Sequence, residues 1–150
     1  MSSQEKRVAV SLISSLIVLA LYIYYGAGLH ASGALGGPDA NYLVGKSAFI
    51  MIGIGIVVSI ITHIIFTIVH TVATGEQHSN EAADERDKLI ELKAMQIAFI
   101  AFSFGFMALL GVMTFGTISP YLVILLTIAC LYSASILADC IKLALYRRGF

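Results

Sequence analysis

Two stretches without a single charged residue constrain the fold of this chain more than any other feature. Residues 47–74 and 94–138 contain no Asp, Glu, Lys or Arg, and the second stretch is 45 residues long. About 20 predominantly apolar residues cross the hydrocarbon core of a bilayer as a helix, so the longer stretch exceeds one span. Gly116 and Pro120 mark a short turn that divides it into two helices.

A third apolar segment, residues 8–25, precedes these stretches and lacks charge over 18 residues. The apolar region of a secretory signal is about 7–15 residues long, so we interpret this segment as a retained span. The chain is 59% hydrophobic and only 12% charged, which favours the lipid bilayer as its surroundings. The sequence therefore predicts an all-α integral membrane four-helix bundle in one domain. The expected spans are residues 8–25, 47–74, 89–115 and 121–146.

The segment between the first two predicted spans, residues 26–45, contains six glycines and Pro38. This composition predicts an exposed, mobile loop. His30 and Asp39 fall in this segment, where solvation is a simpler role for them than ligand binding.

Lysine and arginine residues predict the orientation. If four spans alternate in direction, eight of the nine basic residues lie on one side of the membrane and only Lys46 lies on the other. By the positive-inside rule both termini are cytoplasmic, as is the hydrophilic run at residues 81–93. The net charge of zero gives no basic footprint for nucleic acid.

The hydrophilic run is the one long charged segment of the chain, and we expect it to begin a helix that enters the third span without a break. The third helix would then extend into the cytoplasm. Its charges predict either a network that joins the cytoplasmic ends of the spans or a docking surface for a protein partner. The expected members of this charged network are Asp84, Glu85, Arg86, Asp87, Lys88, Glu91, Lys93 and Lys142.

The second predicted span carries a polar stripe. Ser59, His63, Thr67 and His70 are spaced by four, four and three residues, so they share one helix face. Such a face must contact other helices or a cavity. It predicts either a packing seam or a path for a proton, an ion or a ligand. The two histidines lie about 10 Å apart along the axis, so they do not predict a shared metal ion, and neither a metal nor a cofactor is expected.

Asp139 is the one acidic residue deep inside an apolar segment. Counting inward from the cytoplasmic ends places it at a depth similar to those of His70 and Gln96. An unpaired charge there costs at least about 2.5 kcal/mol, so we expect a partner among Lys142, Lys93, Gln96 and His70. The alternatives are a structural ion pair and a proton acceptor or cation site.

Motifs for hydrolysis and nucleotide binding do not occur. The sequence has no G-x-S-x-G, H-E-x-x-H or Walker loop, so enzyme activity has no residue-level support. Cys130 and Cys140 form no metal-ligand spacing and are interpreted as small buried hydrophobes.

Residues 84–94 read D-E-R-D-K-L-I-E-L-K-A and lead into an apolar helix. This run resembles the motif D-E-R-D/E-x-x-I-x-x-K-A of small uncharacterised bacterial four-span membrane proteins, which carry it between the second and third spans. The resemblance implies a multi-pass protein of the bacterial inner membrane. It implies no catalytic residue.

Three classes of function fit these features. The favoured one is a non-catalytic regulatory or accessory membrane protein that acts through residues 81–93 and a membrane or cytoplasmic protein partner. The alternative is a small proton- or ion-coupled transporter that uses the polar stripe and Asp139, with a homodimer supplying enough helices. The third is an intramembrane enzyme or redox protein.

Overall fold

The computed structural model describes residues 3–74, 85–116 and 118–148, and within these ranges the fold is all-α. The helices are α1 (Ser3–Ala31), a short 3-10 turn η1 (Ala34–Gly36), α2 (Ala40–Thr74), α3 (Glu85–Phe115) and α4 (Pro120–Arg147). The predicted helical fold with four long helices is confirmed.

All four long helices are long and apolar enough to cross a membrane. A helix bonds all its interior backbone groups within itself, which suits a solvent that offers no hydrogen bonds. Large apolar side chains are exposed along the helices, including Phe49 at 81%, Phe104 at 76% and Phe115 at 91%. Such side chains would be costly in water. These features indicate a multi-pass membrane protein.

The helices extend beyond the predicted spans, and the prediction of a long loop at residues 26–45 is wrong. Helix α1 continues to Ala31 and α2 begins at Ala40, so eight residues separate them, three of which form η1. Glycine costs a helix about 1 kcal/mol relative to alanine, which these long apolar helices tolerate. The reversal occurs at Gly33, whose φ of 71° is left-handed, and the Gly36 amide donates to the Gly33 carbonyl at 3.0 Å.

The other two boundaries agree with the sequence pattern. Helix α3 starts within the charged run at Glu85 and continues unbroken to Phe115, as expected. Helix α4 starts with Pro120 at its first position, where the missing amide hydrogen removes no helical bond. The predicted division of the long apolar stretch into two helices is therefore confirmed.

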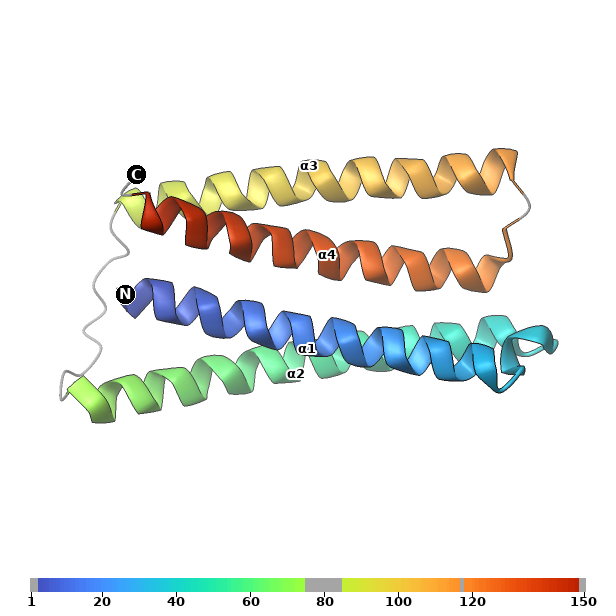
Figure 1. The fold of residues 1–150 in the computed structure, drawn as a ribbon, viewed down its shortest axis with the longest axis horizontal. Coiled ribbons are helices and arrows are strands. Elements are labelled where there is room, and N and C mark those ends of the chain that lie inside the picture. The colour runs from blue at the N-terminus through green and yellow to red at the C-terminus, as the bar shows by residue number, and fades with distance from the viewer. Residues whose placement is uncertain (1–2, 75–84, 117, 149–150) are drawn as a thin grey trace.

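The helices pair as two antiparallel hairpins, with both termini and the start of α3 at one end of the bundle (Figure 1). Helix α4 packs against α3, α1 and α2, and α1 also packs against α2. Helices α2 and α3 share no comparable interface in the described part of the chain. Helices α1 and α4 therefore form the centre, and the ends of all four meet where the termini lie.

An apolar cluster fills the half of the bundle away from the termini. Tyr22, Ala48 and Ile128 are buried together, one from each of α1, α2 and α4. The Tyr22 hydroxyl donates to the Leu125 carbonyl at 3.4 Å, so the one polar atom of this cluster is satisfied. This packing joins α1, α2 and α4 in that half of the bundle.

Two glycines bring α4 close to its neighbours. A Cβ at Gly105 of α3 would collide with the Cys130 sulfur, and a Cβ at Gly55 of α2 would collide with the Tyr132 hydroxyl. Close approach at small residues is a common way for helices to associate in lipid. Cys130 and Tyr132 thus hold α4 between α3 and α2.

We expect Gly105→Ala to lower the stability of the bundle by about 1–3 kcal/mol, because the new methyl group overpacks the contact with Cys130. The matched control is Gly111→Ala in the same helix, whose Cβ would meet nothing within 4 Å. Thermal unfolding in detergent measures the difference. Adding Cys130→Ala to Gly105→Ala should recover the lost stability, and equal melting temperatures for the two glycine variants would contradict this packing.

Candidate functional site

A cavity opens where the four helices meet at the end that carries both termini. It has a volume of about 200 Å³, and every long helix contributes to its walls. We call it the charged cavity. Its lining residues are Gln4, Arg7, Val8 and Ser11 of α1, His63 of α2, Asp87 and Glu91 of α3, and Asp139, Lys142 and Tyr146 of α4.

Asp139 lies at the buried end of this cavity and is 7% exposed. The Ser11 hydroxyl donates to Asp139 Oδ2 at 2.9 Å across 128 residues of sequence. Ser11 was not among the partners expected from the sequence. A hydroxyl donor lowers the cost of a buried carboxylate without neutralising its charge, so Asp139 remains able to bind a proton or a cation.

Lys142, one of the expected partners, interacts electrostatically with Asp139, and its Nζ also lies 3.9 Å from Glu91 Oε1. Asp87 accepts a hydrogen bond from the Tyr146 hydroxyl. Asp87 and Glu91 of α3 therefore both interact with side chains of α4 at the rim of the charged cavity, while Asp139 lies deeper. With three carboxylates against Arg7 and Lys142, the lining has an excess of one negative charge when His63 is neutral.

His63 has a defined orientation. Its Nδ1 lies 2.8 Å from the Ser59 carbonyl oxygen, which can only accept, so Nδ1 carries the proton and donates. In the neutral ring Nε2 then holds the lone pair and is an acceptor. His63 also borders a second, smaller cavity, so it connects the two.

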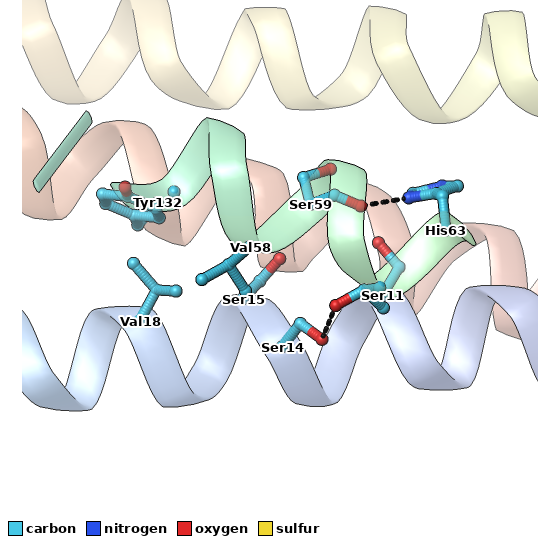
Figure 2. Close-up of a pocket in the computed structure, with 10 residues that line it drawn as sticks. Ser11, Ser14, Ser15, Val18, Val58, Ser59, His63 and Tyr132 are labelled. Carbon is cyan, nitrogen blue, oxygen red and sulfur yellow. Dashed lines mark hydrogen bonds between the residues drawn. The ribbon is translucent and has the colours of Figure 1, made fainter. Parts of the chain in front are cut away.

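The second cavity has a volume of about 40 Å³ and lies between α1, α2 and α4. We call it the serine chamber (Figure 2). Ser14 and Thr62 join across it with their hydroxyl oxygens 3.2 Å apart. Its lining residues are Ser11, Ser14, Ser15, Val18, Gly55, Val58, Ser59, Thr62, His63 and Tyr132.

Sequence reasoning named only the α2 side of this chamber. It missed the α1 serines, although Ser11 is three residues before Ser14 and four before Ser15, which is the spacing of one helix face. Tyr132 was missed because an isolated tyrosine in an apolar helix carries no pattern. The three serines within the apolar segment 8–25 were the available signal.

Thr67 and Gln96, two further predicted site residues, line neither of the two cavities. Thr67 is exposed, and its hydroxyl donates to the His63 carbonyl at 2.9 Å within α2. Gln96 is exposed on α3 and borders neither cavity. The side chain of His70 and the whole of Asp84 lie outside the described residues. The polar stripe of α2 therefore reaches the chamber through Ser59 and His63.

The predicted charged network divides into two faces of α3. Asp87 and Glu91 turn toward the charged cavity. Exposed residues of the same segment are Glu85, Arg86, Lys88 and Lys93. The run is thus partly a wall of the cavity and partly an outer surface.

The chemistry that this arrangement offers is proton or cation binding by oxygen and nitrogen acceptors. Among the residues that the structure describes, no three His, Cys, Asp or Glu side chains are grouped to hold a metal ion. No protein-family model, curated protein or solved structure matches the chain. The resemblance of residues 84–94 to the bacterial four-span proteins stays a prediction.

We expect Ser11→Ala to lower the free energy of unfolding by about 1–3 kcal/mol, because the buried Asp139 carboxylate loses its hydroxyl donor. The control is Ser133→Ala, since the exposed Ser133 hydroxyl bonds only to Ala129 within its own helix. Unfolding in detergent measures both. If the hydrogen bond to Asp139 is the reason, Ser11→Ala should change the free energy of unfolding very little in a protein that already carries Asp139→Leu. A loss of about 1–3 kcal/mol in that protein as well would contradict the role of the bond.

Proposed function

We propose that this chain is a small proton- or cation-coupled membrane transporter whose binding site is the charged cavity. The observation that supports it most strongly is the position of Asp139: a buried carboxylate at the inner end of a cavity that all four helices line. Ionisable groups placed inside a membrane commonly belong to ion paths and proton relays.

The site's chemistry favours positively charged species. Among the residues that line the cavity, Asp139 is the buried one, and the neutral His63 ring adds an acceptor at Nε2, while Arg7 is exposed. A proton or a small cation neutralises the buried carboxylate, which makes binding favourable in a medium of low dielectric constant. Anionic solutes would instead meet the excess negative charge.

The proposal includes an orientation. The residues that line the cavity belong to one end of the bundle, and Figure 1 shows that both termini and the start of α3 lie at that end. Most Lys and Arg residues of the chain also belong to that end, which the positive-inside rule assigns to the cytoplasm. We therefore propose a protein of the bacterial inner membrane with both termini cytoplasmic and the charged cavity open to the cytoplasm.

A transporter must also open on the other side. The packed cluster of Tyr22, Ala48 and Ile128 lies on the far side of the cavity along α1, α2 and α4, and it would be the barrier in one of two alternating states. Helices α2 and α3 lack an extended interface with each other, and a second copy of the chain would supply further helices. A homodimer is thus part of the proposal.

Reconstitution into vesicles tests this function. Wild-type protein should dissipate an imposed pH or cation gradient, and Asp139→Asn should slow that flux by about tenfold or more, because the amide cannot take up a proton or bear charge. Glu85→Gln is the matched control, since Glu85 is exposed outside the cavity. A pH-sensitive dye inside the vesicles reports the flux, and identical rates for wild type and Asp139→Asn would remove Asp139 from the mechanism.

A regulatory or accessory role is the second candidate, and the outer face of α3 favours it. Leu89 and Leu92 are 54% and 63% exposed, beside the exposed charges of Glu85, Arg86 and Lys88. A mixed apolar and charged surface of this kind suits a protein partner.

The two candidates predict different sensitive residues. If a partner binds this face, Lys88→Glu should reduce its recovery by cross-linking in native membranes, because a rim charge of the wrong sign repels the partner. Asp139→Asn should leave that recovery unchanged. If the cross-link is lost in Asp139→Asn but kept in Lys88→Glu, the partner does not bind the outer face of α3.

A further inference from the structure

We propose that the serine chamber is a proton relay between the charged cavity and Tyr132, so that the species coupled to transport is the proton and not a metal cation. This inference rests on the transport function proposed above and deepens it. Three features of the chamber carry it: its size, its lining and its two ends.

The size and lining of the chamber suit water and protons better than metal cations. Its volume of about 40 Å³ suits water, which needs at least about 10–15 Å³ by the same measure. A sodium or potassium ion would have to shed its hydration shell to enter, and the described residues of the chamber lining include no carboxylate to compensate the ion for it. A proton needs no such compensation, because it moves along hydrogen bonds by exchange between neighbouring oxygen and nitrogen atoms.

The lining supplies groups that both give and take protons in hydrogen bonds. Each hydroxyl has one donor and two acceptor sites, so the side chains of Ser14, Ser15 and Thr62 can hold a water in either direction of transfer. Two of them are already joined, Ser14 to Thr62 at 3.2 Å. A chamber walled by such groups stabilises a chain of hydrogen bonds through an otherwise apolar bundle.

Two residues connect this chain to the charged cavity. Ser11 donates to Asp139 at 2.9 Å and also lines the chamber. His63 lines both cavities with Nδ1 fixed on the Ser59 carbonyl. A proton that leaves the Asp139 carboxyl group adds to the Nε2 lone pair of His63, which gives a carboxylate and an imidazolium. The imidazolium then releases that proton to a water of the chamber and returns to the neutral ring.

The inner end of the chamber is the Tyr132 hydroxyl. It donates to the Met51 carbonyl at 3.1 Å and lies directly against Gly55. Beyond it the next polar group is the Tyr22 hydroxyl, which interacts electrostatically with Tyr132 and donates to the Leu125 carbonyl. The residues packed with it, Ala48 and Ile128, are apolar. The relay is therefore blocked in this state, and release on the far side requires the Tyr132 hydroxyl to leave Met51.

Ion replacement on the wild-type protein tests the inference first. Vesicles carry a pH gradient in buffers where sodium and potassium are fully replaced by N-methyl-D-glucamine, with a proton ionophore control. A proton relay predicts the same rate with and without the metal ions. A rate that requires sodium or potassium overturns the inference while leaving transport itself in place.

A filling substitution then tests the chamber directly. Ser15→Val places methyl groups in the chamber and should slow proton flux by about tenfold, as expected when a relay loses its water. Ser133→Val is the matched control, because Ser133 is exposed on α4 and should keep the wild-type rate. Gel filtration and helical circular dichroism verify that each variant folds, and Ser14→Val replaces Ser15→Val if the latter does not.

The outcomes separate the two proposals. Absence of gradient dissipation in the wild type, for every ion, contradicts the transport function and this inference together. Flux that is lost in Asp139→Asn but unaffected by filling the chamber contradicts the relay alone. Flux that is independent of metal ions and lost on filling the chamber supports both.

Discussion

The hydrogen bond from Ser11 to Asp139 is the interaction on which this account of the molecule depends. It joins the first helix to the last at a point where a carboxylate is 7% exposed. A carboxylate in lipid must find partners. Here its hydrogen-bond donor is the Ser11 hydroxyl, while Lys142 and His63 interact with it electrostatically. A hydroxyl donor supports the carboxylate without neutralising it, and this is the basis for proposing that Asp139 binds a proton or a cation.

The division of the bundle into two halves follows from the distribution of small and polar residues. Serines on α1 and the Ser59–His63 segment of α2 leave space and hydrogen-bonding groups at the end with the termini. Tyr22, Ala48 and Ile128 pack together on the other side of Tyr132, where the Tyr22 hydroxyl is bonded to the Leu125 carbonyl. Glycines at 55 and 105 let α4 approach both neighbours, so one helix determines the positions of the others. The result is a bundle with polar cavities at one end and an apolar cluster in the other half.

Sequence reasoning predicted the helices well because hydropathy in a bilayer is a strong constraint. The break near Pro120, the start of α3 within the charged run and the number of long helices all follow from it. The prediction of a loop at residues 26–45 was wrong because it treated glycine as a helix breaker. Helices α1 and α2 in fact continue through Gly26, Gly28 and Gly45. Single-residue propensity is weak beside the need to satisfy the backbone in lipid.

The site was only half predictable for a related reason. The polar stripe on one helix is visible in the sequence, so His63 and Ser59 were predicted. Which helix packs against that stripe depends on the tertiary structure, and the sequence does not show it. Ser11 and Asp139 are separated by 128 residues, and no local pattern joins them.

The most direct measurement of the central claim is the accessibility of the charged cavity in a protein whose native cysteines are replaced. The account predicts that Val8→Cys, in the charged cavity, reacts with a membrane-impermeant thiol reagent from the cytoplasmic side only, while Tyr42→Cys reacts only from the opposite side. Labelling of both cysteines from the same side of the membrane would contradict this arrangement, and so would a Val8→Cys that reacts from neither side.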